Sequence, residues 1–254
     1  MKKCAAALAS LVILSGCTST PEADTGSVRL DSPEVHSQPF HVKLAIGLDK
    51  GQPIPIGNAP LKSNDTGLFV SGEMSLGAGF SAKYQTGKAV KATLKYQFSG
   101  QHAETSQAGN VSHAITLGYL SDHESGVESK EESNLSPATS RAWDLDHDLI
   151  DIAWITGYRL SEETLLYGSV FYQTGEIDGT YYRTTYNGCG EQYAAECTLN
   201  HFSDDGSAFG VSLSLEYAFT KSFLGSFEVV HSRSNWFNRN EDDTLVNGNF
   251  IYQF

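Results

Sequence analysis

The sequence has no long apolar run and little positive charge. No stretch reaches the roughly 18 consecutive apolar residues by which a membrane-spanning helix is recognised. Only 17 Lys and Arg stand against 30 Asp and Glu, which gives a formal net charge of −13. An acidic chain repels the phosphates of DNA and RNA, so nucleic acid is excluded as a partner. A membrane β-barrel stays open, because its strands are short and only half apolar.

Motifs of common enzymes and metal sites are also missing. The sequence contains no GxSxG, no HExxH and no phosphate-binding P-loop. The acidic run 144–148 (DLDHD) lacks the Gly and Glu of a calcium-binding EF-hand, because Leu149 and Ile155 occupy those positions. The eight His are scattered without a pair at ligand spacing. We therefore expect no metal, no cofactor and a solvated acidic loop over 121–148.

The N-terminus has the pattern of an export signal. Two lysines precede the apolar run 5–14, which is too short to span a bilayer and is typical of a secretory signal. Residues 14–17 (LSGC) resemble the lipobox of bacterial lipoproteins, which are cleaved before the cysteine and lipidated on it. The resemblance implies a signal peptide over 1–16 and lipid on Cys17. Thr18, which is not Asp, favours the outer membrane by the sorting rule of that family.

Two cysteines remain after processing. Cys189 and Cys197 lie in a loop-like stretch of a chain exported to an oxidising compartment, so we predict a disulfide between them. Residues 17–39 are rich in Ser, Thr, Pro and acidic residues and show no period. They are predicted to form a lipidated flexible tether, followed by the folded body over 40–254.

The body alternates between apolar and polar residues. In one segment the apolar positions are Val90, Ala92, Leu94, Tyr96 and Phe98, with polar residues between them. A period of two predicts strands with one apolar face, so the body is expected to be an all-β antiparallel barrel. The candidate strands are 40–48, 68–84, 90–98, 111–120, 149–160, 164–173, 209–219, 223–232 and 245–254.

Those nine segments must give an even number of strands in a barrel of this kind. Eight result if 40–48 does not span, and ten result if 68–84 is two strands. The unbroken alternation over 68–84 favours eight and leaves ten possible.

Aromatic residues at the strand ends favour a membrane barrel over a soluble sandwich. The strands are about ten residues long, as a tilted membrane strand requires. Tyr158, Phe219 and Phe223 lie next to short turns, like the aromatic girdle of a membrane barrel.

The chain ends in alternating aromatics. Phe250, Tyr252 and Phe254 share one face and resemble the C-terminal signature of bacterial outer-membrane barrels, which the barrel-assembly machinery reads. The resemblance implies a Gram-negative outer membrane, with outer-membrane lipid and lipopolysaccharide as partners. It also places short turns such as 220–222 in the periplasm and the long segments 121–148 and 174–205 outside.

Charges of both signs are predicted to face the lumen. They are Glu73, Lys83, Lys91, Lys95, Asp151, Arg159, Glu216 and Glu228. In a narrow barrel they would form a salt-bridge network without a wide pore. The predicted role is structural or surface-interacting. The alternatives are a small-solute channel and a lipid A-modifying acyl hydrolase.

The hydrolase alternative depends on residues 230–235 (VHSRSN). They superficially resemble the His-x-Ser-Asn motif of outer-membrane lipid A deacylases, whose His and Ser lie two apart on one face of a strand. Here Arg233 stands two residues after His231, and Ser234 falls on the opposite face. Leu245 stands where that family has its acid. We therefore predict that the chain is not an enzyme.

Overall fold

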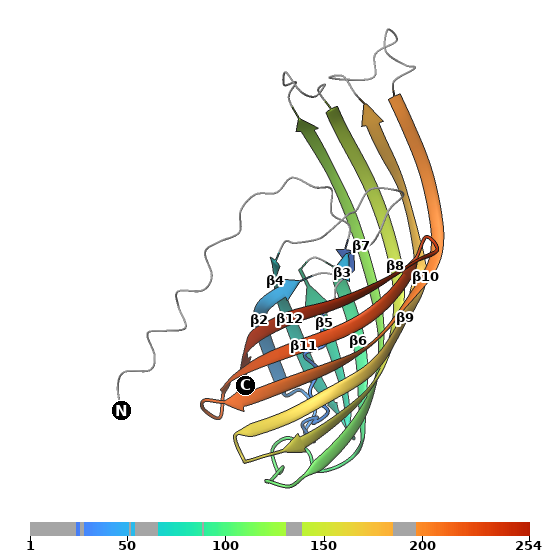
Figure 1. Cartoon of the computed structure of the whole chain (residues 1–254). Helices are drawn as coiled ribbons and strands as arrows, with labels where there is room; N and C mark the ends of the chain where they lie inside the picture. Colours follow the sequence, from blue (N-terminus) through green and yellow to red (C-terminus); the bar gives the residue numbers. More distant parts are fainter. Residues whose placement is uncertain are drawn as a thin grey trace.

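The computed structural model is a closed antiparallel barrel of ten strands (Figure 1). It describes residues 24–25, 28–50, 52–53, 66–87, 89–130, 139–184 and 197–254. The barrel strands are β2 (Val42–Lys50), β4 (Thr66–Gly77), β5 (Phe80–Thr86), β6 (Val90–Ser99), β7 (Val111–Lys130), β8 (Thr139–Arg159), β9 (Thr164–Thr184), β10 (Cys197–Ala218), β11 (Phe223–Trp236) and β12 (Arg239–Gln253). The predicted all-β antiparallel barrel is confirmed.

Each barrel strand pairs with its neighbours in chain order, and β12 pairs with β2 to close the ring. That closing seam runs from Lys43 opposite Gln253 to Leu48 opposite Gly248. Two short strands, β1 (Asp24–Thr25) and β3 (Gln52–Pro53), pair with each other outside the ring. In the described ranges, no helix is long and apolar enough to cross a membrane.

A tight turn explains why the barrel has ten strands and not the eight that the alternation favoured. The stretch 68–84 divides into β4 and β5 at Gly77-Ala78-Gly79, where φ is +86°, +51° and +82°. A Cβ on Gly79 would lie 2.6 Å from the backbone oxygen of Gln97, so this position needs glycine. The alternation continues across the hairpin because the register shifts by one residue between Ser75 and Gly77. Ser75 therefore pairs with Ser81 on the lumen side, and the alternation hides the break.

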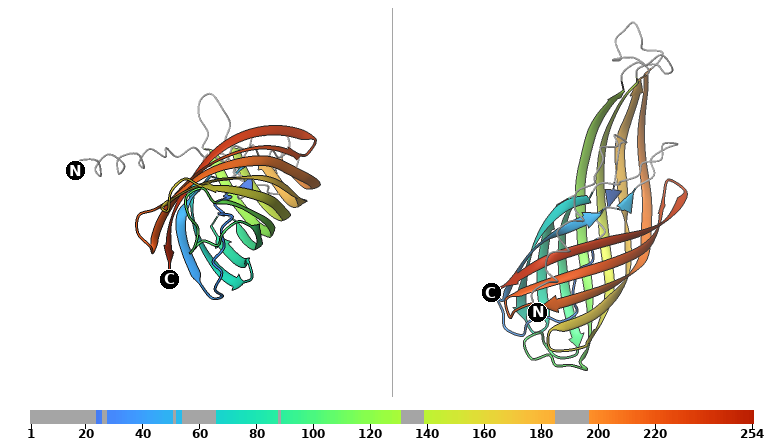
Figure 2. Two further views of the ribbon diagram at one scale, coloured as in Figure 1. Left: turned by 90° about the horizontal axis from the view of Figure 1, so that it is seen from below. Right: turned by 60° about the vertical axis from the view of Figure 1, so that its left-hand side comes forward.

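Four long strands project beyond the rest of the barrel. β7, β8, β9 and β10 have 20 to 22 residues and rise past their neighbours in both side views (Figures 1 and 2). The prediction of outer loops over 121–148 and 174–205 is therefore wrong for most of both segments. Asp144, Asp146 and Asp148 face outward while Leu145 and Leu149 are buried, so the acidic run is itself a strand with period two.

The barrel has two unlike ends. The turn end carries the C-terminus and the connections 78–79, 100–110, 160–163 and 219–222. The projecting end carries the connections 87–89 and 237–238, together with the far ends of the four long strands. Phe237 and Asn238 have positive φ and make the tight turn between β11 and β12.

The N-terminal segment fills the lumen. Residues 28–35, here named the lumenal segment, are all buried and lie within the ring of strands (Figure 2, left). The flexible tether predicted over 17–39 is therefore wrong for this part of the chain. After residue 35 the chain leaves through the turn end and enters β2.

Candidate functional site

The inner face of the barrel carries the charges that the alternation predicted there. Lys91, Lys95, Asp151, Arg159, Glu216 and Glu228 are buried, and Glu73 and Lys83 are half-buried. Two ion pairs join wall residues: Lys95 Nζ lies 2.7 Å from Glu73 Oε1, and Lys91 Nζ lies 3.4 Å from Asp151 Oδ1. Lys83, Arg159 and Glu228 instead contact the lumenal segment.

Arg29 ties the segment to the middle of the lumen. Its guanidinium pairs with Asp151 and lies 3.6 Å above the ring of Phe171. Its backbone N–H donates to Glu228 Oε2 at 2.8 Å, and Asn247 donates to the same oxygen at 3.1 Å. Arg29 thus contacts three strands: its guanidinium contacts β8 and β9, and its backbone N–H donates to Glu228 of β11.

Asp31 and Ser32 of the lumenal segment contact the wall formed by β5 and β6. Lys83 Nζ donates to Asp31 Oδ1 at 2.8 Å. Lys95 Nζ donates to the backbone oxygen of Ser32 at 2.9 Å, in addition to its pair with Glu73. Strands β5 and β6 therefore hold the segment through the half-buried Lys83 and the buried Lys95.

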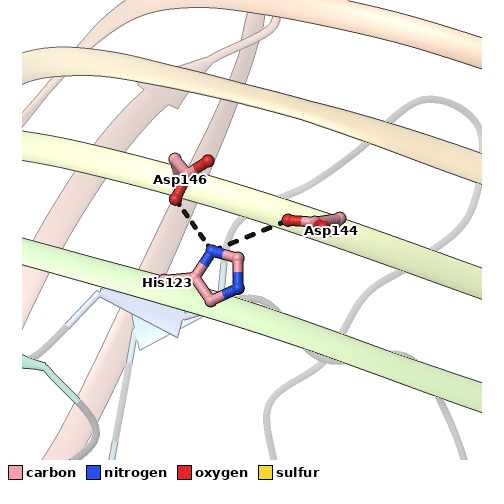
Figure 3. Close-up of side chains that lie close together, drawn as sticks. All are labelled: His123, Asp144 and Asp146. Carbon is pink, nitrogen blue, oxygen red and sulfur yellow. Dashed lines mark hydrogen bonds and ion pairs between the residues drawn. The ribbon is translucent and has the colours of Figure 1, made fainter.

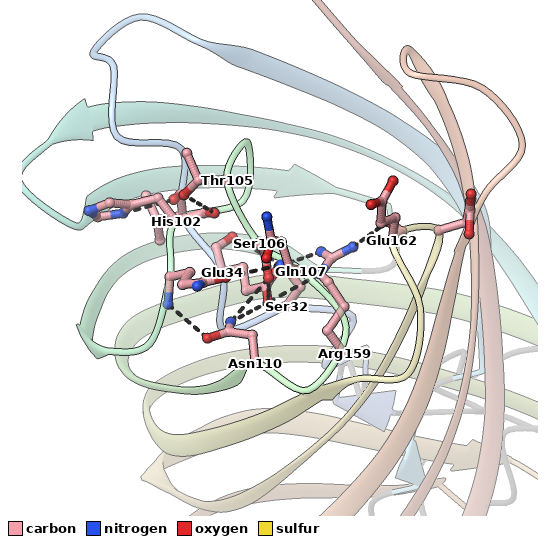
Figure 4. Close-up of polar contacts among 12 residues, drawn as sticks. Ser32, Glu34, His102, Thr105, Ser106, Gln107, Asn110, Arg159 and Glu162 are labelled. Carbon is pink, nitrogen blue, oxygen red and sulfur yellow. Dashed lines mark hydrogen bonds and ion pairs between the residues drawn. The ribbon is translucent and has the colours of Figure 1, made fainter.

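Glu34 lies in a polar clasp at the turn end (Figure 4). Its side chain is 1% exposed and is paired with Arg159, whose Nε donates to Glu34 Oε2 at 3.0 Å. Ser106 Oγ and Asn110 Nδ2 donate to Glu34 Oε1 at 2.6 and 2.9 Å. Arg159 also donates to the backbone oxygen of Glu162 at 2.9 Å. The carboxylate is thus held by β8 and by the connection 100–110.

Backbone hydrogen bonds extend this clasp. The N–H of Val35 donates to Gln97 Oε1 at 2.7 Å, and the backbone oxygen of Val35 accepts from the N–H of Ala103 at 3.2 Å. Ser37 donates its N–H and its hydroxyl to Glu104. Partial burial alone would raise the pKa of Glu104, but these hydrogen bonds lower it.

A histidine pair closes the exit of the segment. The rings of His36 and His41 stack with centroids 4.0 Å apart. Burial, and then the proximity of His36 and Lys43, lowers the pKa of His41. A cavity of about 810 Å³ opens beside them, and Glu34, Arg159 and Glu216 line it. The turn end is therefore polar and charged, and it contains a cavity.

The projecting end is closed by apolar side chains. A buried cluster there comprises Ala89, Leu120, Leu145, Leu149, Ile177 and Trp236, with Phe202 and Phe237 packed against it. Nearby, Val28 and Leu30 of the lumenal segment pack on Phe69 of β4. Hydrophobic burial therefore supplies most of the packing at this end of the lumen, where Nε2 of the buried His147 also lies 3.1 Å from Asp122 Oδ2.

Large apolar side chains cover the outer face of the barrel. All ten strands contribute, with Phe209, Val211 and Leu213 on β10 at 45 to 59% exposure. The aromatic residues Phe219, Phe223, Phe250, Tyr252 and Phe254 gather at the turn end, where the Phe223 and Phe250 rings stack 5.7 Å apart. The predicted assembly-signal residues Phe250, Tyr252 and Phe254 thus share the exposed outer face.

A histidine and two aspartates meet on the projecting strands (Figure 3). His123 Nδ1 lies 2.8 Å from Asp146 Oδ1 and 3.6 Å from Asp144 Oδ1, and all three side chains are exposed. The hydrogen bond and charge of Asp146, and then Asp144, raise the pKa of His123. Sequence spacing missed this cluster because pairing of β7 with β8 creates it. An exposed ion pair accounts for the geometry.

The residues of the hydrolase alternative do not meet. His231 is exposed on the outer face and lies 3.0 Å from Thr244 Oγ1, whereas Ser234 is buried on the lumen side. The structure therefore keeps the histidine and the serine on opposite faces of β11, as their spacing indicated.

Three predicted sites concern cysteines. Cys17 and Cys189 lie outside the described residues, so lipidation and the disulfide stay predictions. Cys197 is the first residue of β10.

Sequence reasoning missed the charges of the lumenal segment. Arg29, Asp31 and Glu34 supply partners for Asp151, Lys83 and Arg159. One signal was available, because residues 28–31 (VRLD) alternate between apolar and charged with the period of an extended chain.

Comparison with known proteins gave distant structural similarity only. No family model and no curated protein matches the chain. Ail, the attachment invasion locus protein of Yersinia pestis, is similar at 10% identity and a TM-score of 0.35, over 85% of this chain and 98% of that one. The outer membrane channel DcaP of Acinetobacter baumannii is similar at 11% identity and a TM-score of 0.23, over 85% and 96%.

Proposed function

We propose that the chain is an outer-membrane β-barrel lipoprotein with a structural or surface-interaction role, closed by its own N-terminal segment. The observation that carries the proposal is the inverted polarity of the barrel. Apolar side chains of all ten strands face outward, and the charges face a filled lumen. In water each exposed Leu or Phe would forgo about 1.5–3 kcal/mol of burial, so lipid is the solvent that suits this surface.

The lumenal segment supports a role without an open pore. Arg29, Asp31 and Glu34 bind three different parts of the wall, and the apolar cluster around Trp236 fills the projecting end. A solute crossing the barrel would have to displace buried ion pairs, and breaking one such pair costs several kcal/mol. The small-solute channel is therefore the weaker alternative for the intact chain.

Orientation follows from the two ends. The C-terminus and the short turns 78–79, 160–163 and 219–222 lie at the turn end, and the four longest strands project from the other end. Barrels of the outer membrane keep short turns in the periplasm and longer extensions outside. The projecting strands would then stand above the outer surface, with Asp146, Asp148 and Asp178 exposed beside lipopolysaccharide. Surface interaction would use this projecting sheet, and the lipid on Cys17 would add an anchor.

Membrane insertion is tested by extraction and by gel mobility. The Cys17→Ala variant removes the predicted anchor, so a spanning barrel should stay in the membrane fraction after alkaline washing. It should also migrate differently before and after boiling in detergent. Release of this variant by alkali would overturn the proposal. Pore closure is tested separately in planar bilayers, where the intact chain should give no conductance steps.

A further inference from the structure

The lumenal segment has a definite direction through the barrel. At the projecting end, Asp24 and Thr25 pair with Pro53 and Gln52, which belong to the connection between β2 and β4. At the turn end, Glu34 is bound by Arg159, the last residue of β8. The chain therefore enters the lumen at the projecting end and leaves it at the turn end.

Contacts along the way fix the same order. Val28, the first residue of the lumenal segment, clusters with Phe69, which lies near the start of β4 at the projecting end. Arg29 meets Asp151 halfway along the lumen, and Val35 reaches the connection 100–110. β2 then runs back from the turn end to the projecting end. The N-terminal end of the described chain thus lies opposite the C-terminus.

We infer that the mature N-terminus emerges on the cell surface, where the acyl chains on Cys17 enter the outer leaflet. This inference rests on the proposed function, which supplies the lipid and the orientation. Cys17 is seven residues before Asp24. Seven residues span at most about 25 Å, roughly the height of the apolar band of such a barrel.

A return to the periplasmic leaflet is physically excluded. The lumen is filled by residues 28–35, so the preceding chain cannot pass back through it. A path along the outside would place residues 18–23 (TSTPEA) in hydrocarbon with unpaired backbone groups, each of which costs several kcal/mol. The glutamate in this stretch adds a further penalty. The outer leaflet is the lipid surface within reach.

The anchor therefore acts on the same side as the projecting sheet. A lipoprotein whose linker ran directly into the periplasm would anchor its barrel in the periplasmic leaflet. Here Asp24 and Thr25 pair with β3 at the projecting end, so the anchored chain reaches the barrel from that side. The ligand of this site is the acyl region of the outer leaflet.

Cysteine labelling on intact cells tests this topology. In a Cys189→Ser/Cys197→Ser background, single cysteines are placed at Thr20 or Ala23, with controls at Asn134 for the projecting end and Lys221 for the turn end. A membrane-impermeant maleimide should label the variants at 20, 23 and 134 on intact cells. The variant at 221 should react only after permeabilisation. Each variant is first shown to fold by its heat-modifiable mobility.

The controls at 134 and 221 distinguish a wrong position of the N-terminus from a barrel that does not span the membrane. If 134 and 221 react on opposite sides and both 20 and 23 behave like 221, the surface N-terminus is wrong while the spanning barrel stands. If 134 and 221 react alike, the spanning barrel itself is wrong and the inference falls with it. Labelling at 23 but not at 20 on intact cells would place the lipid away from the surface and overturn the inference.

Discussion

The two ends of the barrel hold the same segment by different physics. At the turn end, Glu34 is bound by charge-assisted hydrogen bonds from Arg159 and neutral donors. At the projecting end, Val28 and Leu30 pack against Phe69 without ion pairs among those three residues. Charge-assisted hydrogen bonds require a defined geometry, and their strength depends on pH. The stability that apolar contacts supply depends on how well the side chains fill the available volume. The clasp therefore sets the register of the segment, and the apolar end excludes water.

Deleting residues 28–35 should have the largest effect, because it removes the charged contacts of the segment at the turn end and the packing of Val28 and Leu30 on Phe69 at the projecting end. We expect a barrel that gives conductance steps in planar bilayers where the intact chain gives none. The measurement is single-channel recording at matched protein density. A deletion of 132–137, between β7 and β8, is the control and should stay silent. Silence of both variants would show that the wall side chains alone fill the lumen.

Arg159→Met should weaken the turn end strongly. The variant leaves Glu34 buried without its cation, and breaking a buried pair in this way costs about 3–5 kcal/mol. Urea unfolding in detergent, followed by the heat-modifiable gel shift, measures the change in unfolding free energy. The double variant Glu34→Gln/Arg159→Met should recover part of the loss. An unchanged midpoint for the single variant would contradict a structural role of the clasp.

Leu145→Ala should weaken the projecting end without touching any charge. Its side chain is buried in the cluster with Trp236, and such truncations cost about 2–5 kcal/mol. The same unfolding assay reports the loss, which should be constant between pH 5 and pH 8. Ile150→Ala on the exposed outer face is the control, since it leaves no cavity in the lumen. A loss as large in the control would refute the assignment.

Acidification should lower the unfolding free energy through groups at the turn end, and we expect this effect to be the smallest of the four. The lowered pKa values of His41 and Glu104 mean that the unfolded chain binds more protons, so both contributions are lost as pH falls. For His41 the loss begins below its ordinary value of 6.5, and for Glu104 below 4.5. Unfolding midpoints measured from pH 7 to pH 4 should decline, and His41→Gln should remove the upper part of the decline. Leu145→Ala should keep the wild-type profile.

Alternation alone predicted much of this architecture. It placed Lys91 and Lys95 inside and Leu94 outside, because a strand in a barrel has no other way to divide its side chains. It failed at Gly77 to Gly79, where a tight turn preserves the alternation. The acidity of 121–148 predicts a loop, yet residues 144–149 (DLDHDL) alternate between exposed and buried side chains as a strand does.

The site was harder to predict than the wall. Residues 28–35 are short, contain Pro33 and have three charges, which is the composition of a tether in solution. Only the complementary charges of Asp151, Lys83 and Arg159, which come from three distant strands, make this segment a lumenal ligand. Pairing of that kind depends on tertiary structure and leaves no local pattern.

The closing seam has a consequence for how the chain assembles. β2 directly follows the lumenal segment, yet its partner β12 is the last strand made, and the two pair only from Lys43 opposite Gln253 to Leu48 opposite Gly248. Once that seam forms, eight residues with three charges could enter only by threading a closed ring. The segment must therefore settle into a curved, open sheet first, so ring closure is the step that traps it.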